Sequence, residues 1–315
     1  MKHYLVTGVA GFIGSHLAEQ LLQDEQNMVT GIDNFDTFYA RSIKESNLIN
    51  LSNHPRFHFI EGDIRNANWQ SSIKDSIDII CHIAAKAGVL PSIQDPIAYE
   101  DVNVKGTYEM LEFARKQEIK QFVFASSSSI YGVNPNTPWS ESDPIIRPIS
   151  PYAATKIACE LAGYTYSHLY NIRFVGLRFF TVFGPRQRPD LAIHKFTKSI
   201  IEGSAIKMYG DGSTKRDYTF VSDIVKGIIS AGDYSKSMYE IINLGNNKPV
   251  TLKELISSIE NAIGKKAIIE PMPEQPGDVP VTYADISKAK LLLNYQPAVS
   301  LQEGINRFYN WYIQK

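Results

Sequence analysis

The sequence predicts an α/β protein: a doubly wound parallel sheet with a smaller α/β substrate domain at the C-terminal end. Short apolar runs alternate with helical stretches through the first half of the chain, a pattern typical of parallel strands that helices cover on both faces. Pro and Gly become more frequent after about residue 180, where the expected strands are less regular. The six runs that we expect as strands are residues 3–8, 28–33, 57–63, 77–85, 120–127 and 172–180.

The composition is that of an ordinary globular protein. The 315 residues are 43% hydrophobic and 21% charged, with 32 Lys and Arg against 33 Asp and Glu. A balanced charge argues against nucleic-acid binding, which needs a positive field to offset phosphates. No run approaches the ~18 apolar residues of a membrane span, no leader segment is recognisable, and the two cysteines, Cys81 and Cys159, lie far apart. We therefore expect a cytoplasmic protein with no nucleic-acid, membrane or metal partner.

A glycine-rich turn follows the first expected strand. Gly8, Gly11 and Gly14 precede and open a helix expected over residues 12–22. Glycines permit a close approach of the backbone to a pyrophosphate, and the start of the helix supplies free N–H groups and partial positive charge. Asp33, 19 residues after Gly14, ends the second strand, where a carboxylate binds the adenosine ribose and repels a 2′-phosphate. The turn predicts an NAD site; the alternative is that the glycines serve only helix–sheet packing.

A tyrosine and a lysine share one face of a second predicted helix. Ser150 suits the N-cap of this helix and Pro151 its first position, so Tyr152 and Lys156 are separated by one turn. A neighbouring ammonium and a positive nicotinamide both favour the phenolate, which allows Tyr152 to accept a proton from a substrate hydroxyl. The alternative is a packed tyrosine beside a solvated lysine.

Four consecutive serines, within residues 125–132, stand at the end of the fifth expected strand and just after it. Hydroxyl groups at the carboxyl end of a parallel strand point into the ligand crevice, where one of them can relay a proton. A serine-rich turn with no such role is the alternative.

Together these motifs resemble those of the extended short-chain dehydrogenase/reductase family, whose core is a Rossmann-type sheet. The resemblance starts with TGVAGFIGSHL at residues 7–17, the serine run and YAATK at residues 152–156. Residues 177–190, 208–228 and 275–285 narrow it to the nucleoside-diphosphate-sugar epimerases, most closely the UDP-glucuronate 4-epimerases.

The resemblance implies a role for each matching position. Tyr152 and Lys156 are the expected catalytic base and its partner, and Ser127 the expected proton relay. The expected NAD-binding residues are Gly8, Gly11, Phe12, Ile13, Gly14, Asp33, Asn34, Asp63, Ile64, Ala84, Ala85, Lys86, Asn103, Ser126, Tyr152, Lys156 and Phe179. The expected substrate-binding residues are Ser127, Ser128, Ser129, Thr181, Arg188, Tyr209, Arg216, Gln275 and Asp278.

The implied reaction is NAD-dependent 4-epimerisation of a UDP-sugar, from UDP-glucuronate to UDP-galacturonate through a 4-keto intermediate. Ser128 and Ser129 stand where sugar 4,6-dehydratases carry Asp and Glu, and the related UDP-glucuronate decarboxylases commonly carry a Glu in this turn. Without an acid there, epimerisation is favoured. The alternatives are a UDP-glucose or UDP-N-acetylglucosamine 4-epimerase, a UDP-glucuronate decarboxylase and, from a different class, a non-enzymatic NAD-sensing module.

A uronate substrate raises a chemical difficulty, because its 4-keto form is a β-keto acid. Such acids lose CO₂ when the bond to the carboxylate stands perpendicular to the carbonyl plane. A fixed guanidinium can hold the carboxylate away from that alignment. Arg186 and Arg188 are the candidates, and the resemblance favours Arg188; the alternative is that both are surface charges in a Pro-rich loop.

We expect residues 1–180 to form the NAD-binding domain, joined by a segment near residues 218–245. Residues 181–315 are expected to form mainly the UDP-sugar-binding domain, with helical periodicity at 251–263 and 300–313.

The resemblance also implies a homodimer. Its interface would lie on two helices, over about residues 97–117 and 151–170. Tyr99, Met110 and Phe113 on the first of these are either interface or intramolecular core.

Overall fold

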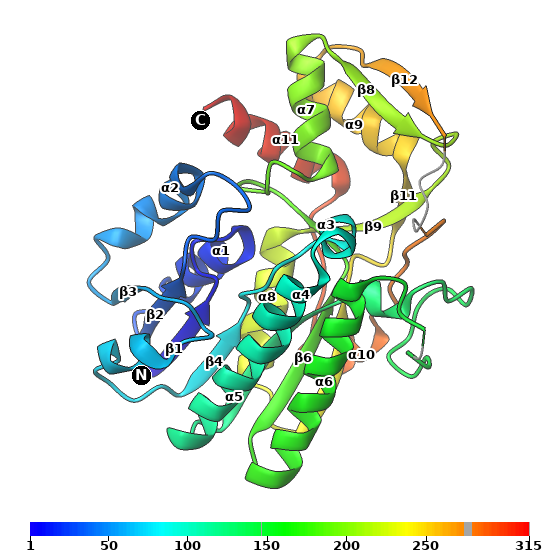
Figure 1. The fold of residues 1–315 in the computed structure, drawn as a ribbon. Coiled ribbons are helices and arrows are strands. Elements are labelled where there is room, and N and C mark those ends of the chain that lie inside the picture. Colours follow the sequence, from blue (N-terminus) through cyan, green and yellow to red (C-terminus); the bar gives the residue numbers. More distant parts are fainter. Residues whose placement is uncertain (146, 274–278, 315) are drawn as a thin grey trace.

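A seven-stranded sheet forms the larger part of the protein, in the computed structural model that describes residues 1–145, 147–273 and 279–314 (Figure 1). Its strand order is β10-β6-β5-β4-β1-β2-β3, and every neighbouring pair is parallel. The six predicted runs supply its first six strands, so the predicted fold class is confirmed. The strands are β1 (Lys2–Thr7), β2 (Asn27–Asp33), β3 (Phe57–Glu61), β4 (Ile79–His82), β5 (Gln121–Ser127), β6 (Arg173–Phe179) and β10 (Tyr239–Leu244).

Helices cover both faces of the sheet, and each face has its own hydrophobic core. Tyr4 and Val6 of β1 pack on the side of α1 and α8, whereas Leu5 packs on the side of α5 and α6. This alternation explains why the strands are apolar throughout. The covering helices are α1 (Phe12–Leu21), α2 (Arg41–Ser52), α3 (Val89–Gln94), α4 (Pro96–Tyr99), α5 (Gly106–Lys116), α6 (Pro151–Tyr170), α8 (Val221–Gly232) and α10 (Ser287–Leu293), with short 3₁₀ turns η1 (Ala67–Ser72) and η3 (Ser128–Tyr131).

The helix expected over residues 97–117 is interrupted. A π-helical turn, η2 (Glu100–Lys105), separates α4 from α5. Such turns accommodate an extra residue in a helix and often occur beside functional sites. Tyr99, Met110 and Phe113 on this segment are 3%, 0% and 2% exposed, so they belong to the intramolecular core and not to an interface.

A smaller part follows β6 and packs at the carboxyl edge of the main sheet (Figure 1). The helices predicted at residues 251–263 and 300–313 are present as α9 and α11, and the side chains of Thr251 and Ser300 cap them. Its strands form the sheets β11-β9-β7 and β12-β8. Its elements are β7 (Thr181–Phe183), α7 (Ala192–Glu202), β8 (Ala205–Tyr209), β9 (Lys215–Phe220), β11 (Pro249–Thr251), α9 (Leu252–Ile263), β12 (Ile268–Met272) and α11 (Leu301–Ile313).

Candidate active site

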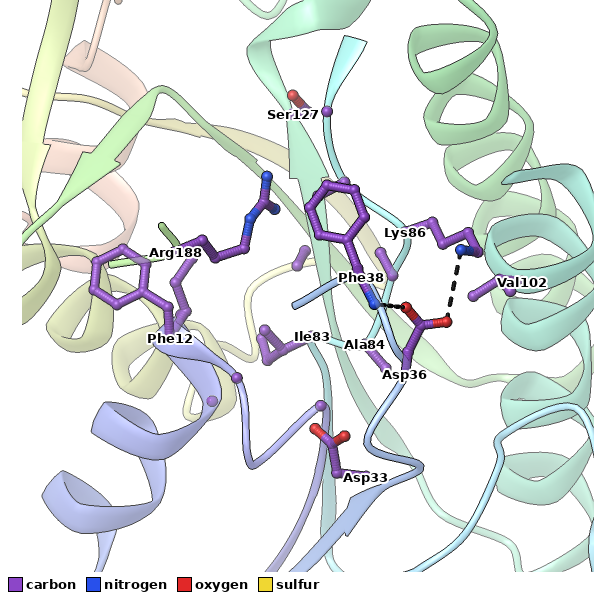
Figure 2. Close-up of a pocket in the computed structure, with 18 of the residues that line it drawn as sticks. Phe12, Asp33, Asp36, Phe38, Ile83, Ala84, Lys86, Val102, Ser127 and Arg188 are labelled. Carbon is purple, nitrogen blue, oxygen red and sulfur yellow. Dashed lines mark hydrogen bonds and ion pairs between the residues drawn. The ribbon is translucent and has the colours of Figure 1, made fainter. Parts of the chain in front are cut away.

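A cavity of ≈ 370 Å³ opens at the carboxyl ends of the parallel strands. It lies where the strand order reverses between β1 and β4, the position at which open α/β sheets bind ligands. Figure 2 shows Asp33 toward one end of the cavity and Ser127 toward the other, with Phe38 and Arg188 between them. The predicted site residues that line it are Gly8, Gly11, Phe12, Ile13, Gly14, Asp33, Asn34, Asp63, Ile64, Ala84, Ala85, Lys86, Ser126, Ser127, Tyr152, Lys156, Phe179, Thr181 and Arg188.

The glycine turn packs so closely on neighbouring backbone that two of its positions have no room for a side chain. Gly8 has a φ of 70°, and a Cβ atom there would lie 2.9 Å from the Cα of Ala84. A Cβ on Gly14 would lie 2.2 Å from the carbonyl oxygen of Gly8, so neither position tolerates a side chain. No side chain caps the start of α1, which keeps its first N–H groups available to an anion. These features fit the pyrophosphate of a dinucleotide.

Two carboxylates, those of Asp33 and Asp63, line the end of the cavity that is farther from Ser127. Asp33 accepts hydrogen bonds from the backbone N–H groups of Ala10 at 3.1 Å and Phe35 at 2.8 Å, while its burial raises its pKa. Arg65 binds Asp63 and lowers the pKa of that carboxyl to about 2. Each oxygen of Asp33 accepts one hydrogen bond and keeps a lone pair for a ribose hydroxyl. Asp63 instead accepts four hydrogen bonds, three from Arg65 and one from Asn34, so its lone pairs are already used within the protein.

Helix α6 carries Lys156, the lysine of the predicted pair, which is buried and lines the cavity. Ser150 caps the helix by accepting from the N–H of Ala153, and a proline follows at the first helical position, as predicted. The Lys156 ammonium donates to the carbonyl oxygen of Ala125 at 2.7 Å. Burial lowers the pKa of Lys156 to about 8, so the charge of this group is sensitive to what binds beside it.

The tyrosine of the pair is subject to opposing influences. Burial raises the pKa of Tyr152, whereas a hydrogen bond from Ser127 and the charge of Arg188 lower it. The Lys156 ammonium lies 5.8 Å from the centre of the Tyr152 ring. A positive cofactor bound in the cavity would add to the two effects that favour the phenolate.

Only one of the two candidate arginines lines the cavity. Arg188 points into it, and its guanidinium binds both oxygens of Asp190, at 2.9 and 2.8 Å. Arg186 instead pairs with Glu19 of α1 at 2.7 Å. Their side chains are only 18% and 14% exposed, so the alternative of two surface charges is wrong.

A buried polar network behind the cavity was not predicted. Ser126 donates to Glu160 at 2.6 Å, and Arg178 binds both oxygens of the same carboxylate, at 3.0 and 2.8 Å. Arg178 also donates to the hydroxyl of Tyr131, at 2.9 Å. A signal did exist in the sequence: Arg178 interrupts an apolar strand, and a buried arginine needs a buried partner.

Five predicted site residues do not line the cavity. The Asn103 amide holds the backbone of Lys86 at both its N–H and its C=O, so it acts on the cavity loop from behind. Ser128 and Ser129 form the start of the 3₁₀ turn η3, while Tyr209 and Arg216 lie on β8 and β9 of the smaller part. Gln275 and Asp278 lie outside the described residues.

No metal or membrane feature accompanies the site within residues 1–145, 147–273 and 279–314. Over these ranges His, Cys, Asp and Glu side chains form no group of three that could hold a metal ion. Over the same ranges every helix is too short or too polar to span a bilayer.

The glycine turn before α1, the carboxylates at one end of the cavity and the pair of Tyr152 and Lys156 together define a class of protein. It is a dinucleotide-dependent enzyme built on a doubly wound α/β sheet.

Comparisons with known proteins assign the chain to a family. The family model described as GDP-mannose 4,6 dehydratase matches residues 5–308, and the chain belongs to this family. The chain is 44% identical over 315 residues to a UDP-glucuronate 4-epimerase of Thermodesulfobacterium geofontis, covering 99% of this chain and 96% of that protein. It matches a crystal structure of UDP-glucuronic acid 4-epimerase from Bacillus cereus in complex with UDP-glucuronic acid and NAD, with a TM-score of 0.93, 38% identity and 99% of each chain covered. The predicted membership of the extended short-chain dehydrogenase/reductases is confirmed.

Proposed function

We propose that this enzyme catalyses the NAD-dependent 4-epimerisation of UDP-glucuronate to UDP-galacturonate. The observation that carries the proposal is the guanidinium of Arg188, which lines the same cavity as Tyr152. Burial raises the pKa of the Tyr152 phenol, and Arg188 lies close enough for its charge to oppose that rise. The similar proteins named as UDP-glucuronate 4-epimerases support it. Although the family model is named for a dehydratase, Ser128 and Ser129 supply no acid for the elimination that a dehydratase needs.

In this mechanism NAD supplies the hydride acceptor and donor, and the protein supplies position and proton transfer. Tyr152 accepts the proton of the sugar 4-hydroxyl, and Ser127 donates a hydrogen bond that stabilises the phenolate. Lys156, anchored on the Ala125 carbonyl, adds positive charge beneath the ring. Return of the hydride to the other face of the 4-keto sugar requires the sugar to rotate while its UDP part stays bound.

The carboxylate of the substrate would be bound by Arg188, with Thr181 as a further donor on the cavity wall. This arrangement keeps the carboxylate out of the perpendicular orientation in which a β-keto acid loses CO₂. Arginine suits the role better than lysine, because its planar fork fixes direction as well as charge.

The division of labour between the two parts of the chain is also a proposal. The UDP part is proposed to lie against the smaller part, where Tyr209 and Arg216 are the candidate contacts together with Gln275 and Asp278. We propose that residues 1–180 with a segment near 218–245 bind NAD and that residues 181–315 mainly bind the UDP-sugar. This division is supported by β10, which is a strand of the main sheet, and by α8, which packs on that sheet.

A cytoplasmic location is supported by Cys81 and Cys159, which are buried and unpaired.

NMR analysis of the products formed from UDP-glucuronate tests the function directly. UDP-galacturonate supports the proposal, whereas UDP-pentose and CO₂ would identify a decarboxylase. Turnover of UDP-glucose or UDP-N-acetylglucosamine with none of UDP-glucuronate would identify a different epimerase. Binding of NAD without turnover of any nucleotide sugar would support the sensing module.

Replacing Arg188 with Ala is expected to lower turnover of UDP-glucuronate about 10- to 100-fold, the effect of losing one or two hydrogen bonds to a charged group. UDP binding should change far less, because the uracil and pyrophosphate do not depend on this side chain. Steady-state kinetics and titration with UDP separate the two effects. Equal losses for UDP-glucuronate and UDP-glucose would remove Arg188 as the residue that recognises the carboxylate.

We propose a homodimer that forms through the face of α4, α5 and α6. This face exposes Ile97, Tyr108, Leu161, Tyr164 and Leu169, a concentration of apolar side chains typical of an interface. Leu161→Glu is expected to convert the dimer to a monomer in sedimentation experiments. Leu291→Glu is the matched control, because Leu291 is also exposed but lies on α10, outside this face. A Leu161→Glu protein with an unchanged sedimentation coefficient would contradict this interface.

A further inference from the structure

We propose that Asp190 and Phe38 are positioning residues that fix the orientation of the Arg188 guanidinium and thereby suppress decarboxylation of the substrate. The inference rests on the proposed function and extends it from the group that binds the carboxylate to the groups that hold it. Both residues lie in loops: Phe38 lies between β2 and α2, and Asp190 lies between β7 and α7.

Asp190 restrains the guanidinium within its own plane. Its two oxygens accept from Nε and Nη2 of Arg188, at 2.9 and 2.8 Å, along one side of the fork. Nη1 has no hydrogen-bond partner among the described residues, and Arg188 lines the cavity. The end of the fork is therefore available for a second carboxylate while its side stays bound to Asp190.

Phe38 restrains the guanidinium by a second contact, in which Cζ of Arg188 lies over the aromatic ring. Its ring centre lies 5.2 Å from Cζ of Arg188, a cation–π distance (Figure 2). Asp36 holds the loop that carries Phe38, accepting from the Phe38 N–H at 3.0 Å and pairing with Lys86 at 3.6 Å. The ring is thus tied through Asp36 to Lys86, which lines the same cavity as Arg188.

These two restraints matter because the competing reaction depends on orientation. In the 4-keto sugar the C5–C6 bond can break, releasing CO₂ and leaving the electron pair in an enolate with the C4 carbonyl. The enolate then takes a proton at C5 to give a 4-ketopentose. A guanidinium that turns freely would bind the carboxylate without fixing its plane, so the C5–C6 bond would more often reach the alignment that breaks it.

The test measures how UDP-glucuronate divides between UDP-galacturonate and decarboxylated products, by NMR. This ratio does not depend on the amount of folded enzyme, so a merely structural role would not change it. Asp190→Ala is expected to raise the decarboxylated fraction about tenfold, the effect of about one charge-assisted hydrogen bond. Asp190→Asn, which keeps one acceptor oxygen, is expected to raise it less.

Two further variants sharpen the test. Phe38→Leu is expected to raise the decarboxylated fraction, and Phe38→Tyr, which keeps an aromatic face, to preserve the wild-type ratio. Asp233→Ala is the control, because it removes an aspartate that pairs with Lys2 at the opposite edge of the sheet. It should leave the ratio unchanged.

The outcomes distinguish a failure of the positioning roles of Asp190 and Phe38 from a failure of the proposed 4-epimerase function. If Asp190→Ala and Phe38→Leu keep the wild-type ratio while Arg188→Ala changes it, the inference is overturned and the proposed function stands. The inference also fails, with the function intact, if Asp233→Ala changes the ratio as much as Asp190→Ala. If the wild-type protein forms no UDP-galacturonate from UDP-glucuronate, the proposed function is overturned and the inference with it.

Discussion

Replacing Tyr152 with Phe is expected to lower kcat about 10²- to 10⁴-fold, the range for loss of a positioned general base. Burial raises the pKa of the Tyr152 phenol, and the hydrogen bond from Ser127 and the charge of Arg188 act against that rise. These two interactions favour the phenolate that accepts the proton. Phe keeps the ring and removes only the titrating oxygen. The variant should therefore stay folded and retain NAD, which absorbance and a nucleotide release assay would measure.

Tyr99→Phe is the matched control for this experiment. The Tyr99 ring contacts the Tyr152 ring edge to face at 6.2 Å, and its hydroxyl donates to the Ala87 carbonyl, away from the lysine. The same chemical change at this neighbour should alter kcat only a few fold. A Tyr152→Phe enzyme that keeps more than a tenth of wild-type kcat would end the assignment of Tyr152 as the base.

The parts of the site that follow regular elements could be predicted from the sequence. Asp33 ends a strand, and Tyr152 and Lys156 occupy one face of a helix whose cap is visible in Ser150 and Pro151. Periodicity determines where such side chains point, so their spacing already placed them at the carboxyl edge of the sheet. The structure puts all of these at or beside the cavity as expected.

Residues in irregular backbone could not be predicted in this way. Arg186 and Arg188 are two positions apart, yet one turns to Glu19 of α1 and the other into the cavity. The backbone at Arg186 has a φ of 64°, a left-handed conformation that breaks any simple alternation. The partners of Arg188 were missed for a related reason, since Phe38 and Asp190 meet it from two loops about 150 residues apart in the sequence.

Replacing Glu160 with Gln is expected to lower the free energy of unfolding by about 3–5 kcal/mol, the cost of removing one partner of a buried ion pair. The side chains of Arg178 and Glu160 are only 4% and 3% exposed. Burial acts to lower the pKa of the Arg178 guanidinium, but the hydrogen bonds and charge of Glu160 raise it above its usual value. Arginine is effectively always protonated in proteins, so Arg178 stays charged in the variant and is left in the core without a counter-ion. The midpoint of urea unfolding measures the loss.

Two further variants separate the ion pair from a general effect of losing a carboxylate. Glu303→Gln breaks an exposed pair with Arg307 on α11 and should not shift the unfolding midpoint measurably. The double variant Glu160→Met with Arg178→Met should be more stable than Glu160→Gln alone, because apolar side chains of similar length remove both charges together. If the double variant is instead the less stable of the two, the cost lies in the hydrogen bonds to Ser126 and Tyr131 and not in an uncompensated charge.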